Sequence, residues 1–211
     1  MHDQGIIHGG LRGGTCSDPA IIRSHSNSPD PKTNILIDND GHARLSDFGL
    51  TRITSDEPTI TSIMGTTTAQ WMSPELLVPD KFGLKGSRPT KASDCYALGM
   101  VIYEVLSGQT PFVQYPTLAV VWKVLEGERP TRPQGEQGAR FTDEIWGILE
   151  RCWEPQPDDR ISAKTVLLDL EGNPSLESPL NVNGGVETDG NDQSGATSSS
   201  PKYVFSVLPP H

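Results

Sequence analysis

Residues 34–49 read Asn-Ile-Leu-Ile-Asp-Asn-Asp-Gly-His-Ala-Arg-Leu-Ser-Asp-Phe-Gly and contain two short runs separated by turn-forming residues. Ile35-Leu36-Ile37 has the composition of a buried strand, and Ala43-Arg44-Leu45-Ser46 alternates as a return strand does. Between them, Asp38-Asn39-Asp40-Gly41 supplies residues that tolerate positive φ. The stretch therefore predicts a β-hairpin that ends at Asp47.

The residues after Glu75 have the pattern of helices. Ala92–Leu106 is apolar nearly all round, which is typical of a buried helix in the core of a domain. Further helices are predicted over Leu118–Leu125, Thr142–Trp153 and Ser162–Leu170. Asp158 and Asp159 stand just before the last of these, where acidic residues favour a helix start. The sequence thus predicts a mainly α fold with one small hairpin.

Several motifs stand in a fixed order around this hairpin. His8-Gly9-Gly10-Leu11-Arg12-Gly13 precedes it, Asp47-Phe48-Gly49 closes it, and Trp71-Met72-Ser73-Pro74-Glu75 follows, with Asp94 and Arg160 further on. A lone Asp-Phe-Gly is weak evidence for any function, since a turn closed by glycine explains it equally well. The ordered set is far more specific.

By this order of motifs the chain resembles protein kinases, in particular the tyrosine-kinase-like serine/threonine group and a form frequent in fungal genomes, over about Gly5–Leu170. The resemblance implies the kinase C-terminal lobe, which is helical and carries one hairpin. We expect residues 1–171 to form this partial kinase domain, with an irregular insertion over 14–33. Residues 172–211 are rich in Gly, Ser, Asn, Thr, Asp and Pro and are expected to be a disordered tail.

The resemblance also implies roles for particular residues. Asp47 would hold the magnesium ion that bridges the ATP phosphates, and Asn34 would hold a second ion. Leu36 would pack beneath the adenine, and Arg12, where the family has lysine, would lie near the γ-phosphate. Gly10 occupies the position of the aspartate that receives the proton of the substrate hydroxyl. The cofactors implied are ATP and Mg²⁺.

Other matching residues imply structural roles. Glu75 and Arg160 are expected to form a bidentate ion pair that holds the activation segment. Asp94 is expected to accept backbone N–H groups of the His8-Gly9-Gly10 loop, and His8 is expected to pack against Phe48 rather than act in catalysis.

Three departures from the family predict impaired activity. Glycine at position 10 cannot accept a proton, and a positioned general base contributes roughly 10² to 10⁴ in rate. Residues 14–33 stand where the family has a single residue between Gly13 and Asn34, so we expect them to disrupt the catalytic loop. Nothing before His8 matches the glycine-rich loop, the strand lysine or its glutamate partner. We therefore expect this chain to contact ATP from one side only, without the elements that cover the nucleotide in the family.

Two further interpretations concern regulation and the gene. Gly9 replaces the arginine that reads a phosphorylated activation loop in many kinases, so phosphate on Thr59, Ser62 or Thr66 would lack that partner. The polar, abrupt character of residues 15–33 also suggests an in-frame retained intron, which sequencing of the transcript would test. Removing it would leave Gly10 unchanged.

Composition limits the classes of partner and the compartment. The net charge of −10 argues against nucleic acid and anionic membrane surfaces, and no stretch has the uncharged length of a membrane span. Cys16, Cys95 and Cys152 lack metal-ligand spacing and are interpreted as reduced thiols. These features predict a cytoplasmic protein, and the resemblance to kinases implies a protein substrate or protein partner.

Three functions remain open at this point. The first is family-level kinase activity, the ATP-dependent transfer of a phosphoryl group to serine or threonine. The second is a pseudokinase or truncated lobe that binds partners through the helices after Pro111. The third is a gene fragment without a function.

Overall fold

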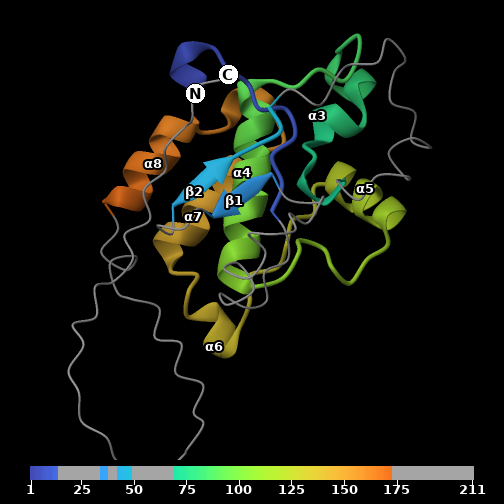
Figure 1. Ribbon diagram of the computed structural model, residues 1–211. Coiled ribbons are helices and arrows are strands. Elements are labelled where there is room, and N and C mark those ends of the chain that lie inside the picture. The colour runs from blue at the N-terminus through green and yellow to red at the C-terminus, as the bar shows by residue number, and fades with distance from the viewer. Residues whose placement is uncertain (14–33, 38–41, 49–68, 173–211) are drawn as a thin grey trace, which may run out of the picture.

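The computed structural model describes residues 1–13, 34–37, 42–48 and 69–172 (Figure 1). The insertion, the hairpin turn, the candidate phosphorylation sites and the tail lie outside these described residues, so their predictions are not tested.

The described elements follow one another along the chain as mainly helical segments with a single pair of strands. In order they are η1 (His2–Gln4), β1 (Ile35–Ile37), β2 (Ala43–Leu45), η3 (Ala69–Trp71), α3 (Pro74–Leu77), η4 (Pro79–Phe82), α4 (Lys91–Ser107), α5 (Thr117–Leu125), α6 (Gly135–Gly138), α7 (Asp143–Cys152), η5 (Pro157–Asp159) and α8 (Ala163–Glu171). The predicted mainly α fold with one hairpin is confirmed.

Helix α4 runs through the middle of the molecule, with α8 on one side and α3 and α5 on the other (Figure 1). Its first turn is closed by a capping box, in which the Ser93 N–H donates to Thr90 Oγ1 at 3.1 Å and the Thr90 N–H donates to Ser93 Oγ at 2.8 Å. It ends at Gly108, whose φ of 70° is left-handed. Tyr96 and Met100 are fully buried, so the prediction of a core helix is confirmed.

The other long helices match their predicted ranges to within a residue at each end. Asp158 and Asp159, which precede α8, belong to the separate 3-10 turn η5. The helix begins later, where the Thr165 N–H donates to Ser162 Oγ at 3.1 Å. The helix therefore begins after the acidic pair, as predicted, and the Ser162 side chain caps its first turn.

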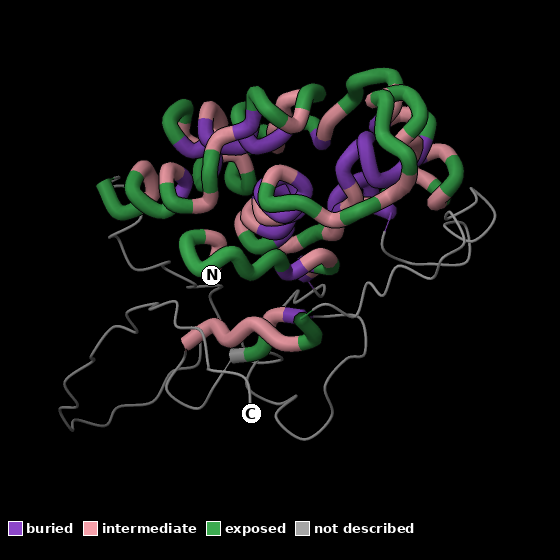
Figure 2. Tube along the Cα trace, turned by 90° about the horizontal axis from the view of Figure 1, so that it is seen from above, coloured by how far each residue is buried: buried purple, intermediate pink, exposed green. Residues whose placement is uncertain are grey.

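Strands β1 and β2 pair antiparallel with Ile35 opposite Leu45 and Ile37 opposite Ala43, so the predicted hairpin is confirmed. The pairing continues beyond the strands, because the Ser46 N–H donates to the Asn34 carbonyl at 2.9 Å. This register sets Asn34 beside the residues that follow β2. Figure 2 shows buried residues concentrated in the helices, whereas the hairpin has mostly intermediate exposure.

A buried ion pair ties the start of α3 to the chain ahead of α8. Arg160 Nη1 and Nη2 donate to the two oxygens of Glu75 at 2.7 and 2.8 Å, and Arg160 Nε donates to the Glu154 carbonyl at 2.8 Å. The side chains of Arg160 and Glu75 are 0% and 1% exposed. The predicted bidentate pair is confirmed, and its carboxylate has no access to water as a substitute partner.

We expect Arg160→Ala to lower the free energy of unfolding by about 3–5 kcal/mol, because it leaves the Glu75 charge buried without its partner. Arg160→Lys should recover only part of this loss, since an ammonium lacks the planar fork that meets both oxygens. Urea unfolding of the variants measures both effects. Asp169→Asn, which breaks an ion pair with side chains 46% and 36% exposed, is the control and should cost less than about 1 kcal/mol. An Arg160→Ala loss as small as that of the control would contradict the prediction.

Two helical glycines offer a matched test of packing between α4 and α7. A Cβ on Gly99 of α4 would lie 2.7 Å from Cys152 Cβ, whereas a Cβ on Gly147 of α7 would meet nothing within 4 Å. Gly99→Ala should therefore destabilise the protein by about 1–3 kcal/mol through overpacking. Gly147→Ala should stabilise it by about 0.5–1 kcal/mol, because alanine has the higher helix propensity. Thermal unfolding of both variants checks the opposite signs.

Candidate functional site

The loop from His8 to Gly13, hereafter the His8–Gly13 loop, is held on α4 by the Asp94 carboxylate. The His8 N–H donates to Asp94 Oδ2 at 2.7 Å and the Gly9 N–H donates to Oδ1 at 2.8 Å. His2 Nε2 lies 3.0 Å from the same Oδ2. The predicted role of Asp94 is confirmed for His8 and Gly9, while the Gly10 N–H donates elsewhere, to His8 Nδ1 at 3.2 Å.

His8 is fully buried and both of its ring nitrogens are engaged. Nδ1 accepts from Gly10, and Nε2 lies 2.9 Å from the Ser46 carbonyl, which can only accept. These bonds fit the tautomer with its proton on Nε2. The ring centroid lies 4.9 Å from that of Phe48, so the prediction that His8 packs against Phe48 is confirmed.

Asn34 returns to the His8–Gly13 loop despite the insertion between them. Asn34 Nδ2 donates to the Gly10 carbonyl at 2.5 Å, and the Asn34 N–H donates to the Arg12 carbonyl at 3.3 Å. The expectation that the insertion would separate these residues was wrong for the described part of the chain. The free-energy cost of closing a longer loop grows only slowly with its length, and these two bonds together with the Ser46 contact hold its end.

The oxygen of the Asn34 amide group is less well satisfied than its nitrogen. Asn34 is 4% exposed, and its Oδ1 has no hydrogen-bond partner among the described residues. Asp47 lies across the hairpin end, is exposed, and has φ of 60°. A left-handed conformation at a residue other than glycine is a form of strain found at functional sites. An amide oxygen and a carboxylate are donors that Mg²⁺ accepts.

The remaining predicted site residues surround this point. Gly10 is exposed and brings only backbone groups to the site, one of which accepts from Asn34. Gly9 has φ of 76°, which glycine adopts without the cost that a side chain would bring. Arg12 is partly buried next to the loop end. The roles of Arg12 and Leu36 toward a nucleotide stay predictions.

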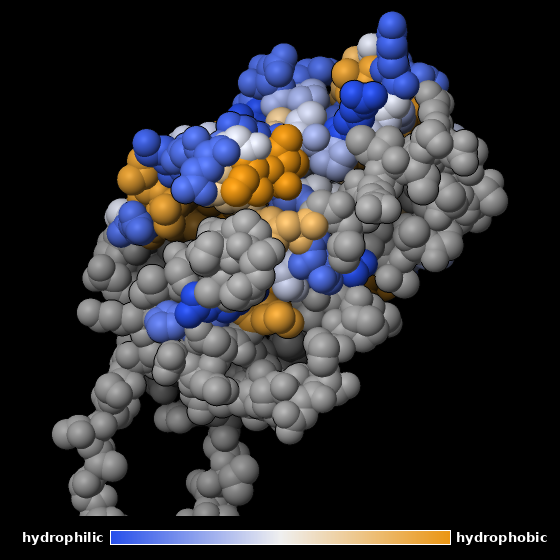
Figure 3. Space-filling model, turned by 45° about the horizontal axis from the view of Figure 1, so that its top comes forward, coloured by the Kyte–Doolittle hydropathy of each residue, from blue (hydrophilic) through white to orange (hydrophobic). Residues whose placement is uncertain are grey.

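Leu36 belongs to a group of large apolar side chains that are 36–38% exposed near the hairpin and the His8–Gly13 loop. The others in this group are Ile6, Ile7 and Phe48. On the face shown in Figure 3, hydrophobic patches interrupt a mainly hydrophilic surface. Leu36 is thus accessible to a planar apolar ligand.

Sequence reasoning missed Glu104, which is 3% exposed near the end of α4. Its Oε2 accepts from Trp71 Nε1 at 3.0 Å, and its Oε1 has no partner among the described residues. Burial raises the pKa of the Glu104 carboxyl to about 7, although the Trp71 hydrogen bond opposes the shift. An acidic residue within the apolar second half of the helix was the signal that could have drawn attention to it.

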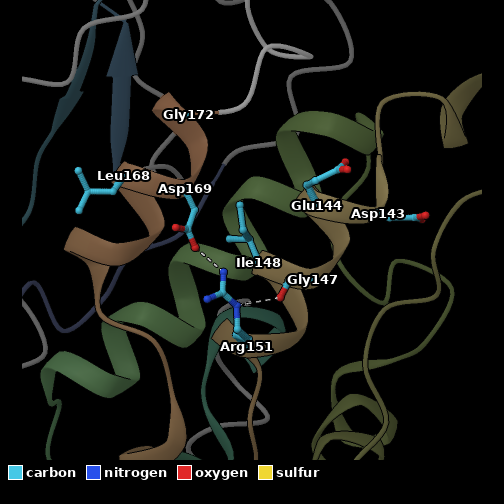
Figure 4. Close-up of a pocket in the computed structure, with 8 residues that line it drawn as sticks. All are labelled: Asp143, Glu144, Gly147, Ile148, Arg151, Leu168, Asp169 and Gly172. Atoms are coloured by element: carbon cyan, nitrogen blue, oxygen red, sulfur yellow. Dashed lines mark hydrogen bonds and ion pairs between the residues drawn. The ribbon is translucent and has the colours of Figure 1, made fainter.

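A shallow groove between α7 and α8 contains none of the predicted site residues. Arg151 of α7 reaches across it to pair with Asp169 of α8 and also donates to the Gly147 carbonyl (Figure 4). The Arg151–Asp169 ion pair therefore spans the groove.

A model of a known protein family matches most of the described part of the chain. The model for protein tyrosine and serine/threonine kinases matches residues 32–170. The chain belongs to the protein kinase family. The described kinase residues include Asn34, Asp47 and Arg160, on which the site and the ion pair depend.

Individual relatives come from distant organisms. The chain is 31% identical over 159 residues to the cytoplasmic tyrosine-protein kinase BMX of Mus musculus, covering 74% of this chain and 23% of that kinase. It is 33% identical over 170 residues to gdt4 of Dictyostelium discoideum, whose name is probable serine/threonine-protein kinase, covering 81% and 9%. It is 28% identical over 167 residues to the cytokinesis protein sepH of Emericella nidulans, covering 79% and 10%. The chain thus spans less than a quarter of each of these relatives.

Within the described part of the chain, no helix has both the length and the apolar character needed to cross a bilayer. Cys95 and Cys152 are buried and free, as expected of reduced thiols.

Glu104 should make the stability of the protein depend on pH. Its pKa is about 7 in the folded chain against an ordinary value of 4.5, so the folded state retains a proton that the unfolded state releases first. The free energy of unfolding should therefore fall as pH rises from about 4.5 to 7, by up to about 3 kcal/mol, and should then level off.

Urea unfolding of the wild type and of Glu104→Gln across this pH range measures the effect as a difference between the two proteins. Glutamine cannot ionise, so the difference should grow with pH in favour of Glu104→Gln. Glu126→Gln, at an exposed position, is the control and should show a constant difference from the wild type. A constant difference for Glu104→Gln would show that this carboxyl does not retain its proton on folding.

Proposed function

We propose that this chain is the C-terminal lobe of a kinase domain that binds Mg-ATP and is impaired in the transfer of its phosphoryl group to serine or threonine. Asn34 carries the proposal, since its buried Oδ1 lacks a partner while its Nδ2 is fixed on the Gly10 carbonyl. This arrangement fixes the amide group and leaves one buried oxygen available as a donor to a metal ion. The proposed domain limits stay at residues 1–171, followed by the tail.

Asn34 and Asp47 would hold the metal in this proposal. The metal would neutralise the phosphate charge that otherwise repels an incoming hydroxyl. Leu36 would contact the adenine from below, and Arg12 would approach the γ-phosphate with a permanent positive charge. The protein's own part is to hold these groups in place through the backbone contacts of the His8–Gly13 loop.

Impairment follows from the lack of a proton acceptor at position 10. Gly10 has no side chain, and the neighbouring imidazole of His8 is buried with both nitrogens bonded. A substrate hydroxyl would lose its proton without a positioned base, which lowers the rate by roughly 10² to 10⁴. We therefore expect this chain to bind Mg-ATP but to transfer its phosphoryl group slowly.

A second candidate function is protein binding, favoured by the outer face of α5. Leu118 and Trp122 stand one turn apart on this helix and are 37% and 52% exposed, and Val113 before it is 60% exposed. An exposed tryptophan beside aliphatic residues is a frequent anchor of protein interfaces. A protein substrate or partner in the cytoplasm fits both candidates.

Mg-ATP should raise the midpoint of thermal unfolding of the wild-type chain, because a ligand that binds the folded state stabilises it by RT ln(1 + [L]/Kd), about 1.4 kcal/mol at ten times Kd. Asn34→Ala and Asp47→Ala should each lose most of this shift. Asp143→Ala, which changes an exposed carboxylate on α7, is the matched control and should keep it.

Gly10→Asp separates binding from transfer, since it adds the missing acceptor without touching the proposed metal ligands. It should leave the Mg-ATP shift of the wild type unchanged. A wild-type chain with no shift at millimolar Mg-ATP would rule out the nucleotide-binding proposal and leave protein binding as the surviving candidate.

A further inference from the structure

Helix α4 meets the His8–Gly13 loop through two carboxylates. Asp94, in the first turn of the helix, accepts the N–H groups at the start of the loop. Glu104, near the other end of the helix, lies against Gly13 at the end of the loop. A Cβ built on Gly13 would fall 2.1 Å from Glu104 Oε2 and 2.7 Å from Cδ. Both ends of the loop therefore rest on the same helix.

The contact between Gly13 and Glu104 is so close that a side chain at position 13 and the carboxylate cannot both keep their places. Carbon atoms of real side chains do not approach this closely, so a side chain there would displace the carboxylate. The position of the loop end and the position of Glu104 thus depend on each other.

The same carboxylate contacts a third segment. Trp71 Nε1 in η3 donates to Glu104 Oε2 at 3.0 Å, and the Trp71 side chain is 8% exposed. Element η3 follows the chain that leaves Asp-Phe-Gly, whereas Gly13 precedes the insertion. One buried group therefore joins two segments that are distant in sequence.

The charge on Glu104 is poorly compensated. Its Oε1 has no partner among the described residues, and the groups that face the carboxylate, the Trp71 indole and the Gly13 backbone, do not titrate. Arg12 lies next to Gly13, and Arg140 donates to the Leu106 carbonyl at this end of α4. Neither arginine is a cause of the Glu104 shift, nor is any charged side chain of η3, α6 or α7, since burial and the Trp71 bond account for it.

We propose that Glu104 is a positioning residue whose gain or loss of a proton changes how the end of the His8–Gly13 loop and Trp71 are held on α4. A neutral carboxyl can remain buried beside Gly13 at little cost. An ionised one must find a further donor or water for Oε1, because a buried charge without partners is unfavourable. Such a movement alters its contacts with Gly13 and Trp71 together.

The proposal extends to the metal-binding residue through the loop. Asn34 is bonded to the carbonyls of Gly10 and Arg12, both in the segment that Glu104 holds. That effect on nucleotide binding rests on the proposed function, whereas the coupling of Gly13 to Trp71 does not.

The test is an NMR titration of the full ¹⁵N-labelled chain between about pH 5.5 and 8.5, observing the Trp71 indole N–H and the Gly13 amide. Trp71→Phe assigns the indole signal. Both signals should shift with one common midpoint near the pKa of Glu104, about 7. In Glu104→Gln both shifts should disappear, and in Glu126→Gln both should remain.

The wild-type titration decides the matter even if Glu104→Gln fails to fold. A Trp71 signal that titrates while Gly13 stays constant, or two different midpoints, would overturn the coupling and leave Glu104 a structural residue. Because the titration needs no nucleotide, a failure of Mg-ATP binding would count against the proposed function alone.

Discussion

The hydrogen bonds from the His8 and Gly9 amides to the Asp94 carboxylate are the contacts on which the candidate site depends. They fix the loop on α4, the long helix that runs through the middle of the described lobe, and the loop then positions Asn34 and the end of the hairpin. Its Gly10 carbonyl accepts the Asn34 amide, and its His8 ring reaches the Ser46 carbonyl and Phe48. A short chain of backbone and amide contacts thus connects the core to the hairpin end.

In this arrangement the path of the His8–Gly13 loop does not depend on the side chain at position 10. Shape comes from peptide groups, which glycine supplies as well as aspartate does, so the loop keeps its path with Gly10 in place. In the proposed function the acceptance of a proton needs a side chain at that position, and Gly10 has none. The oxygens of Asn34 and Asp47, which we propose as metal ligands, do not depend on a side chain at position 10.

Sequence patterns predicted those features that arise from local periodicity or from spaced motifs. The apolar run of α4, the pairing of the two hairpin strands, and the Glu75–Arg160 pair all belong to this class. Contacts across the insertion could not be predicted, because Gly10 and Asn34 meet through tertiary packing that leaves no trace in the residues between them. Glu104 was missed because the importance of its carboxylate depends on burial, and the apolar residues around it in the sequence do not show that this side chain is buried. Four-residue helices such as α6 are too short to show a period.

The contacts of the first thirteen residues have a consequence for how the molecule could be divided. Met1–Gly13 is held by Asp94, by Asn34 and by packing on α4, and the peptide chain leaves it at Gly13 and rejoins the described lobe at Asn34. Proteolysis between these two points would leave the part of the chain that ends with Met1–Gly13 bound to the remaining lobe as a separate peptide ligand. The candidate site would then be a two-component assembly, complete only while that peptide is bound, and its occupancy would follow the concentration of a fragment rather than the folding of one chain.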